Sequence, residues 1–442
     1  MFFCKWNPFL LFAYYGISFD FLGGADMGRY RIEGGYPLKG TLTIRGSKNG
    51  ILPVLAAVML TEGETILHQC PFIADVFLTM EVLEQLGCRV KWQGRTVTID
   101  SQNCISTAID SKSVQKMRSS ILFMGALLGR CREAKIGYPG GCEIGMRPID
   151  LHLKAFRKMG VKIKEEKGLL CCDGSRIVGK KINLDFPSVG ATENCMLLAV
   201  KAKGHTTIYN AACEPEIVEL QTFLNKCGAK VKGAGTDCIH IEGVKKLHGT
   251  EYSIAPDRIE AGTFLCGAAI TKGEIQLKNV CPNAMRQVLL RLGEAGCVIK
   301  EGKEEIYLKA PEKILPVSKI HTGPYPGFPT DMQPQFMTVL TLAGGTSIIS
   351  ETVFEARFKH IGELCRMGAD IAVEGQTAII KGVKKLHGAY VSGKDLRGGA
   401  ALILAGLAAE GETVVENACY VQRGYEQIEK SLFSLGAKIF LE

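Results

Sequence analysis

A glycine- and proline-rich segment, residues 137–150, carries the most reactive candidate side chain of the sequence. It holds four glycines, with prolines near both of its ends. This composition is typical of a long loop, and functional residues concentrate on such loops. Cys142 follows two of these glycines, and a thiol exposed close to Arg147 is expected to have a lowered pKa and to be reactive. We therefore interpret Cys142 as a catalytic or covalently reacting residue, with an incidental loop cysteine as the alternative.

Basic side chains stand immediately before several predicted helices or close to the same loop. Helix N-termini attract anions because their first N–H groups are unpaired, and arginine offers two parallel donors to phosphate or carboxylate. If these segments converge, their cations form a strong site for a small anion; the alternative is that each is an ordinary surface charge. The residues concerned are Lys48 with Asn49, Arg118, Arg147, Arg397 with Asp395, and Arg423.

A carboxylate, Asp331, stands at the start of a further predicted helix. It ends the segment 325–331, in which two prolines and a glycine restrict the backbone. The ordinary interpretation is a helix N-cap, and the functional one is a general base that faces the same cleft as the cations. The eight histidines are scattered and receive no role. Hydrolysis of nucleoside triphosphates, hydride transfer and serine hydrolysis are poorly supported, because the sequence has no P-loop, GxGxxG after a strand, GxSxG or HExxH.

The elements that must position these residues form an internal repeat. Six segments each end in a glycine that is followed by a small-x-aliphatic run, at intervals of roughly 70 residues. Each repeat is predicted as helix, strand, helix, strand and strand, with the glycine closing the second helix in the left-handed conformation. The glycines are Gly87, Gly160, Gly228, Gly296, Gly368 and Gly436.

The first helix of each repeat is apolar almost all round, as in residues 121–128, 195–200 and 402–407. Such a helix must be buried on every side. Six of them predict two bundles of three helices with sheets and polar helices outside, which is an α/β fold of two globular units. A solenoid is the alternative, but it would need polar capping repeats. Because the last repeat stops as its strand begins, we expect an N-terminal strand, residues 30–32 or 40–44, to complete it.

The composition is that of a globular protein: 442 residues, 46% hydrophobic and 22% charged, with a net charge of +8. No charge run indicates a nucleic-acid tail, and a mild positive excess suits small anionic ligands. The 17 cysteines show no CxxC and no zinc-ligand spacing, which indicates a reduced, cytoplasmic protein without a metal site. Outside the N-terminus, no apolar run is long enough to cross a membrane. Residues 1–26 are predicted to lie outside the fold, through either a true start at Met27 or a signal or anchor segment.

Several of these segments, in this order, resemble the motifs of the UDP-N-acetylglucosamine 1-carboxyvinyltransferase family of enolpyruvyl transferases. The resemblance covers about residues 27–442 and rests on several long and independent motifs. They lie at residues 46–53, 139–152, 188–194, 326–333, 395–397 and 423–426.

The resemblance implies both a fold and a reaction. The fold is a pair of inside-out α/β barrels, one made of residues 27–47 and 256–442 and the other of residues 48–255. The reaction transfers enolpyruvate from phosphoenolpyruvate to the 3-hydroxyl of UDP-N-acetylglucosamine and releases phosphate, in the first committed step of peptidoglycan synthesis. The resemblance implies no cofactor, no metal, and neither a nucleic acid nor a membrane as partner.

The resemblance also implies residue roles. Cys142 is the general acid that protonates the methylene carbon of phosphoenolpyruvate, can form a covalent adduct with it and is the target of fosfomycin. Asp331 accepts the proton of the sugar hydroxyl, while Asn49 and Asp395 assist the tetrahedral intermediate. The residues that hold the phosphate and carboxylate are Lys48, Arg118, Arg147, Arg397 and Arg423. Those that line the UDP-sugar site are Arg147, Pro148, Ile149, Asp150, Leu151, Ser188, Val189, Gly190, Thr330 and Val353.

Two departures from the family pattern affect these expectations. Some members carry a lysine before Ser188 where this chain has Phe186 and Pro187, so one contact to UDP is in doubt. Others carry aspartate in place of Cys142; with cysteine present, we expect sensitivity to fosfomycin. Two alternatives stay open. One is 5-enolpyruvylshikimate-3-phosphate synthase, which shares the fold and the donor but lacks the Pro-Gly-Gly-Cys loop. The other is a catalytically silent relative that binds the UDP-sugar.

Overall fold

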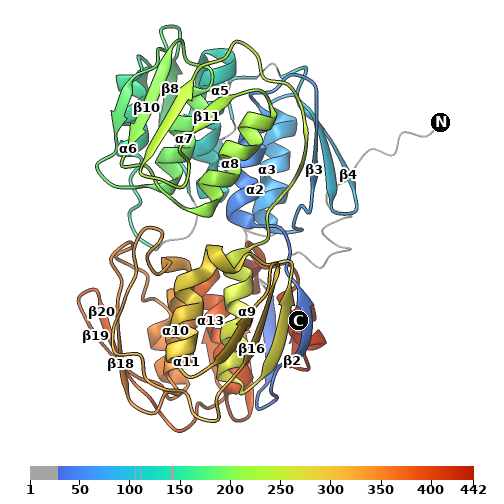
Figure 1. Cartoon of the computed structure of the whole chain (residues 1–442), viewed down its shortest axis with the longest axis vertical. Helices are drawn as coiled ribbons and strands as arrows, with labels where there is room; N and C mark the ends of the chain where they lie inside the picture. Colours follow the sequence, from blue (N-terminus) through green and yellow to red (C-terminus); the bar gives the residue numbers. More distant parts are fainter. Residues whose placement is uncertain (1–27, 105, 110, 141–143) are drawn as a thin grey trace, which may run out of the picture.

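The computed structural model describes residues 28–104, 106–109, 111–140 and 144–442. The predictions for residues 1–26 and for Cys142 lie outside this part of the chain. The described residues form two lobes stacked along the long axis of the molecule (Figure 1). We call them the upper and the lower lobe, as they stand in that view.

Three buried helices fill each lobe. In the lower lobe α13 contacts both α9 and α11, and in the upper lobe α5 contacts both α2 and α7. Their side chains are buried almost throughout, as their apolar sequences predict. The prediction of two bundles of three helices is confirmed. The helices are α2 (Lys48–Val58), α5 (Leu122–Cys131) after the short η1 (Arg118–Ile121), α7 (Val189–Ala199), α9 (Arg258–Ile270), α11 (Gln333–Leu340) after η3 (Thr330–Met332), and α13 (Leu396–Ala408).

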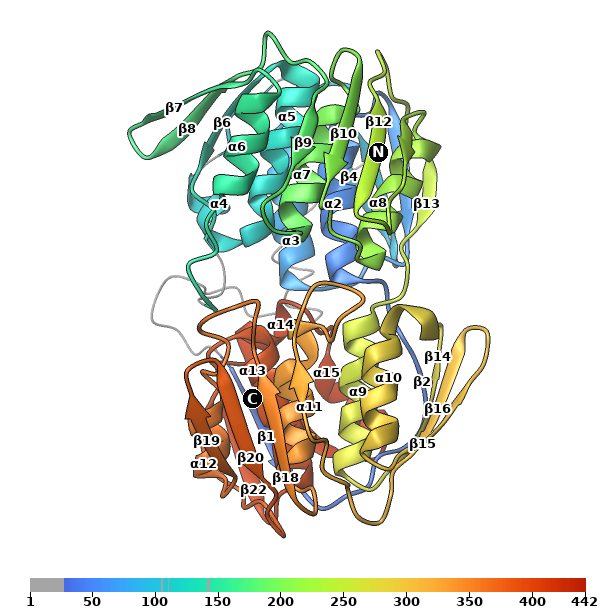
Figure 2. The ribbon, with the colours of Figure 1, turned by 60° about the vertical axis from the view of Figure 1, so that its left-hand side comes forward.

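A second set of helices lies on the outside of the lobes beside the sheets (Figure 2), and the six repeat glycines follow its main members. Each of these glycines has a φ between 93° and 101°, so the predicted left-handed closures are confirmed. These main helices are α3 (Ala74–Gln85), α6 (Asp150–Lys158), α8 (Pro215–Lys226), α10 (Arg286–Glu294), α12 (Ile361–Arg366) and α15 (Ile428–Ser434). Shorter ones are α4 (Ser111–Lys116), η2 (Pro282–Met285) and α14 (Ala418–Gln422).

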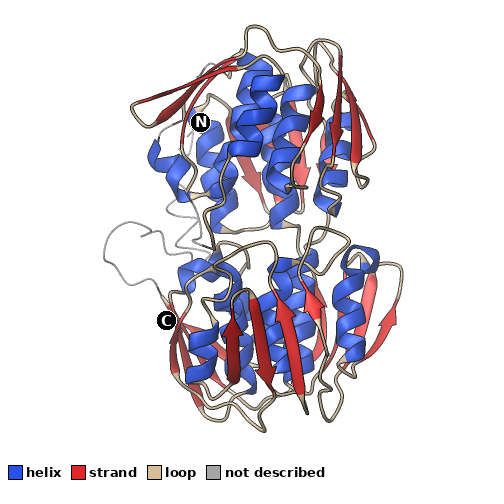
Figure 3. Cartoon of the chain, turned by 90° about the vertical axis from the view of Figure 1, so that its left-hand side faces the viewer, coloured by secondary structure: helices blue, strands red, loops and turns tan. Residues whose placement is uncertain are grey.

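The strands of the described residues form six small sheets at the periphery of the lobes (Figure 3). In sheet order, the upper lobe has β13 (Glu251–Ser253), β3 (Glu64–His68), β5 (Thr96–Asp100) and β4 (Arg89–Gln93); β6 (Glu133–Gly137), β8 (Leu169–Asp173) and β7 (Lys162–Glu166); and β11 (Lys230–Lys232), β12 (Cys238–Glu242), β10 (His205–Tyr209) and β9 (Lys181–Asn183). The lower lobe has β15 (Val298–Glu301), β16 (Glu305–Lys309), β14 (Glu274–Lys278) and β2 (Lys39–Thr43); β17 (Ile320–His321), β18 (Thr346–Ser350), β20 (Thr377–Lys381) and β19 (Asp370–Glu374); and β21 (Tyr390–Ser392), β22 (Glu412–Glu416), β1 (Arg29–Glu33) and β23 (Lys438–Leu441).

The first strand closes the last repeat. β1 lies between β22 and β23 and pairs antiparallel with both, so that Tyr30 stands opposite Val415 on one side and Leu441 on the other. The expectation that an N-terminal strand completes the last unit is therefore confirmed for β1. The alternative strand, β2, instead pairs parallel with β14 (Figure 2).

The chain crosses between the lobes twice. β2 belongs to a lower-lobe sheet but leads into α2 of the upper lobe, whereas β13 pairs with β3 in the upper lobe and leads into α9 of the lower. The two crossing segments run side by side: Ser47 N donates to Ala255 O (2.8 Å) and Asp257 N donates to Arg45 O (2.8 Å). These bonds tie the start of α2 to the start of α9.

The buried hydrophobic residues form two large clusters that follow the lobes. One is drawn from residues 51–254, and the other from residues 30–44 and 259–439. The domain limits, 27–47 with 256–442 and 48–255, stay a prediction. Across the described part of the chain, every helix is too short or too polar to traverse a bilayer.

Candidate active site

Three buried helices begin with polar caps at the junction of the lobes. Asp257 caps α9 by accepting from the N–H groups of its first turn, and its other oxygen accepts from Lys48 N at 3.0 Å, at the start of α2. Asp395 caps α13 by accepting from Arg397 N and Gly398 N, both at 3.0 Å. The starts of helices from both lobes therefore meet, and Asp395 Oδ1 serves as a helix cap.

A buried carboxylate, Asp75 on α3, joins two of the predicted cations. Lys48 Nζ lies 2.8 Å from one carboxylate oxygen, and Arg423 Nε lies 2.8 Å from the other. Burial alone would raise the pKa of Asp75, but Lys48 and Arg423 together lower it to about 2. Burial lowers the pKa of Lys48, and Asp75 opposes that shift. Since Arg423 follows α14 of the lower lobe, this cluster spans both lobes.

A second carboxylate, Asp331, receives two further guanidinium groups. One of its oxygens lies 2.9 Å from Arg357 Nη2, and the other lies 3.0 Å from Arg397 Nη2. Asn49 Nδ2 donates to the same oxygen as Arg397, at 3.4 Å. Burial would raise the pKa of Asp331, but the two arginines hold it well below its usual range. Asp331, Asn49 and Arg397 are thus brought together as the sequence predicted.

Arg397 retains hydrogen-bonding capacity in this cluster. Its guanidinium stacks over the ring of Tyr425, with 5.3 Å between the guanidinium carbon and the ring centroid. Among the described residues, its Nε and Nη1 have no hydrogen-bond acceptor although they are buried. A buried donor of this kind is costly unless a ligand satisfies it. The pKa of Arg397 is raised despite burial, since Tyr425 and Asp331 favour the charged form.

The described end of the glycine-rich loop reaches across to the lower lobe. Met146 N donates to Glu355 Oε1 at 2.6 Å, and Ala356 N donates to Ile144 O at 3.1 Å. The Arg147 guanidinium lies over the ring of Phe354, 5.3 Å from its centroid. The loop and the lower-lobe segment 353–357 therefore form one wall of the junction.

The two loop-associated arginines form a group of their own. Arg118 Nη2 donates to the carbonyl of Arg147 and, at 3.5 Å, to that of Pro148. Burial, with a contribution from Arg147, lowers the pKa of Arg118 to about 10. Arg423 Nη2 donates to Lys116 O at 3.4 Å, two residues before Arg118. This contact connects the loop group with the Asp75 cluster.

The remaining predicted residues lie on three segments. Thr330 and Val353 are joined through Glu351, which accepts from Thr330 Oγ1 and from Val353 N, both at 2.9 Å. Ser188 caps α7 by accepting from Ala191 N, and Val189 and Gly190 form the first turn. The segment entering α6 alternates in exposure: Pro148 and Asp150 are exposed, Ile149 is buried, and Leu151 is half-buried.

Two charged residues of this site were missed by the sequence reasoning: Asp75 and Arg357. Asp75 interrupts an apolar run, Ile73 to Phe77, and is 3% exposed. A charge within an apolar run needs a buried partner, so the sequence did contain a signal that Asp75 pairs with a cation. Arg357 lies outside the regular elements and belongs to no motif, so only the fold identifies it.

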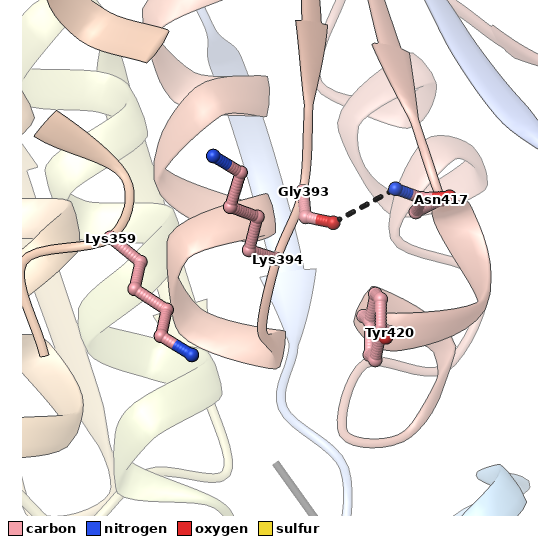
Figure 4. Close-up of a pocket in the computed structure, with 5 residues that line it drawn as sticks. All are labelled: Lys359, Gly393, Lys394, Asn417 and Tyr420. Atoms are coloured by element: carbon pink, nitrogen blue, oxygen red, sulfur yellow. Dashed lines mark hydrogen bonds between the residues drawn. The ribbon is translucent and has the colours of Figure 1, made fainter. Parts of the chain in front are cut away.

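A pocket of about 440 Å³ opens in the lower lobe near the start of α13. It is lined by Lys359, Gly393, Lys394, Asn417 and Tyr420, and Asn417 donates to the carbonyl of Gly393 at 3.2 Å (Figure 4). None of the predicted site residues that the structure describes lines this pocket. Within the described ranges, no three His, Cys, Asp or Glu side chains are grouped as metal ligands would be.

The sequence is similar over most of its length to curated proteins that share one name. A relative from Caldanaerobacter subterraneus subsp. tengcongensis, named UDP-N-acetylglucosamine 1-carboxyvinyltransferase 2, is 52% identical over 93% of this chain and 99% of its own. A relative from Lawsonia intracellularis, named UDP-N-acetylglucosamine 1-carboxyvinyltransferase, is 47% identical with the same coverage.

Two solved structures share the fold. The enolpyruvyl transferase NikO from Streptomyces tendae superimposes with a TM-score of 0.85 at 23% identity, over 94% of this chain and 98% of its own. EPSP synthase from Acinetobacter baumannii superimposes with a TM-score of 0.73 at 18% identity, over 94% and 100%. The family model described as EPSP synthase (3-phosphoshikimate 1-carboxyvinyltransferase) matches residues 32–432. The chain therefore belongs to this family of enolpyruvyl transferases.

Proposed function

We propose that the protein transfers enolpyruvate from phosphoenolpyruvate to the 3-hydroxyl of UDP-N-acetylglucosamine and releases phosphate. The observation that carries the proposal is the name shared by relatives that are 46–52% identical over 93% of the chain. The junction between the lobes supports it chemically, since it gathers the cations that a small polyanion requires. The domain limits given above belong to the same proposal.

The cation cluster suits phosphoenolpyruvate because this donor carries a phosphate and a carboxylate. Lys48, Arg397 and Arg423 are each less than a tenth exposed, and buried cations act on an anion more strongly than exposed ones. In the proposal they hold the donor, with Arg118 and Arg147 at the loop side. Asn49 and Asp395 assist the tetrahedral intermediate.

Asp331 is the proposed acceptor of the hydroxyl proton. With two arginines on its carboxylate it is ionised but a weak base. A bound anion that draws charge from Arg397 would raise the pKa of Asp331 and make proton transfer easier. Cys142, outside the described residues, is proposed to protonate the methylene carbon, which makes the neighbouring carbon electrophilic for attack by the hydroxyl oxygen.

The UDP-sugar is proposed to lie along the wall formed by the loop and the lower lobe. In the proposal, the sugar nucleotide contacts Arg147–Leu151, the start of α7 from Ser188 to Gly190, and Thr330 with Val353. Holding both reactants in one closed cleft contributes on the order of 7–11 kcal/mol to rate acceleration in favourable cases. As part of this proposal, the protein acts in the cytoplasm, supports cell shape and division, and is inhibited by fosfomycin through Cys142.

The decisive experiment measures phosphate release with both substrates present. We expect release only when phosphoenolpyruvate and UDP-N-acetylglucosamine are combined, and its loss in Cys142→Ala and in Asp331→Asn. Cys281→Ala, which changes an exposed cysteine, serves as the matched control and should keep full activity. The proposal is overturned if neither the native chain nor Cys281→Ala releases phosphate when both substrates are present.

The same assay separates the alternatives. Shikimate 3-phosphate in place of the UDP-sugar tests the acceptor that the family model's description names; we expect no release. Binding of UDP-N-acetylglucosamine without any turnover would indicate a silent relative. Full activity after preincubation with fosfomycin, without competing substrate, would count against the assigned role of Cys142.

A further inference from the structure

Two cysteines at the far end of α5 from Arg118 contact each other. Cys131 is the last residue of α5, and Cys104 lies in the turn that follows β5. Their side chains hydrogen bond with one another. Both are partly exposed and neither is in a disulfide. A small oxidant can therefore reach this pair, unlike the fully buried thiols of Cys195 and Cys266.

Arg130, next to Cys131, fixes the turn against the end of α5. Its Nη2 donates to Ser101 O at 2.8 Å and to Gln102 O at 3.4 Å. Its Nη1 donates to Met59 O at 3.2 Å and to the carbonyl of Thr61. Cys104 N donates to Ser101 O at 3.3 Å, so Cys104 belongs to the same fixed turn. The backbones that a bond between Cys104 and Cys131 would join are thus already held together.

The two thiols are chemically unequal. The hydrogen bond from Cys104, the largest effect, lowers the pKa of Cys131 to about 7, with a further contribution from Arg130. The same hydrogen bond, together with burial, raises the pKa of Cys104. Near neutral pH, Cys131 is therefore the thiolate that attacks the oxidant, and Cys104 is the resolving thiol that attacks the resulting mixed disulfide.

We propose that Cys104 and Cys131 form a reversible dithiol–disulfide pair that a low-molecular-weight disulfide oxidises. Cys131 Sγ attacks one sulfur of the oxidant and expels the first small thiolate, leaving a mixed disulfide. Cys104 then loses its proton, and its sulfur attacks Cys131 Sγ and expels the second small thiolate. Two protein thiols are oxidised to one disulfide, and one small disulfide is reduced to two small thiols. Excess small thiol reverses both steps.

The native full-length chain provides the direct test. Reduced protein is incubated with oxidised glutathione near neutral pH, alkylated, digested without reduction and mapped by mass spectrometry. We expect a disulfide that joins the peptides of Cys104 and Cys131 and that disappears with dithiothreitol. The proposal is overturned if both cysteines remain alkylated while the exposed Cys281 or Cys365 carries glutathione. Separate glutathione adducts on Cys104 and Cys131 would also overturn it.

Single variants test the order of the steps. Cys104→Ser removes the second thiol, so Cys131 should accumulate the mixed disulfide with glutathione. Cys131→Ser should leave Cys104 unmodified. Cys281→Ser is the matched control and should form the same cross-link as the native chain. If a serine variant fails to fold, the mapping of the native chain still decides the proposal.

Discussion

Replacing Asp75 by asparagine should destabilise the junction of the lobes. The carboxylate bridges Lys48 and Arg423 at 2.8 Å each, and its side chain is 5% exposed. Its pKa falls from 3.8 to about 2 in the fold, which corresponds to about 2 kcal/mol of stability at neutral pH. The asparagine also removes the negative charge that both buried cations contact, and breaking a buried ion pair costs about 3–5 kcal/mol. We expect the free energy of unfolding of Asp75→Asn to fall by about 2–5 kcal/mol.

The pH dependence distinguishes this charge effect from a packing defect. Because the pKa of Asp75 is lower in the folded state than in the unfolded state, its contribution is complete above pH 4. It is lost as the pH falls toward about 2. The difference between the native chain and Asp75→Asn should therefore be largest near pH 7 and shrink below pH 4. Inorganic phosphate should stabilise the variant more than the native chain, because a bound anion replaces the missing charge.

Urea unfolding at several pH values measures this prediction. Glu242→Gln removes one partner of the exposed Lys230–Glu242 pair and is the matched control; it should cause no measurable change. Equal effects of Asp75→Asn and Glu242→Gln at pH 7 would refute the reasoning. So would a difference between native chain and Asp75→Asn that stays constant from pH 6 to pH 2.

Three further substitutions test other parts of the fold by chemical or thermal unfolding. Burial raises the pKa of Glu219 to about 7, so the folded state loses stability as the pH rises from about 4.5 to 7. Glu219→Gln should abolish this loss and be up to about 3 kcal/mol more stable at pH 8; an unchanged pH profile would contradict it. Gly125→Ala would place a Cβ 2.3 Å from Asn194 Oδ1 where α5 meets α7, at a cost of roughly 1–3 kcal/mol. Its control Gly293→Ala meets no atom within 4 Å and should be neutral or stabilising. Glu426→Gln weakens the contacts of Glu426 with Arg95 Nη1 (2.7 Å) and Phe72 N (2.9 Å) across the lobes and should cost about 1–3 kcal/mol; an unshifted urea midpoint would contradict this.

The repeat and its closure were predictable because they depend on local signals. A glycine after an amphipathic helix specifies a left-handed residue whatever surrounds it, and all six glycines have that conformation. The strand that closes the last repeat was predicted because that repeat has one strand fewer than the others. The burial of helices such as α13 followed from their composition alone.

Local residue patterns did not predict the crossing of the linkers, which only the family resemblance implied. β2 and β13 are short strands of five and three residues, and nothing in the sequence of either strand says which sheet receives it. β2 pairs with β14 and β13 with β3, partners far away along the chain. Pairing over such distances depends on the assembled fold rather than on neighbouring residues. Arg357 was missed for the same reason, since its role exists only once distant segments meet, whereas the charge of Asp75 within an apolar run was a local signal that the sequence reasoning did not use.

The carboxylates at the junction of the lobes partly neutralise the cations gathered there. Four buried cations, Lys48, Arg357, Arg397 and Arg423, meet two carboxylates, Asp75 and Asp331. The carboxylates offset the desolvation cost of burying the cations, and the remaining excess of positive charge can attract an anion. In the proposal, the entering anion competes with Asp331 for Arg397, whose Nε and Nη1 have no hydrogen-bond acceptor within the described part of the chain. In the proposed reaction, an anion that draws charge from Arg397 would raise the pKa of Asp331 and so couple proton transfer to binding of the anion.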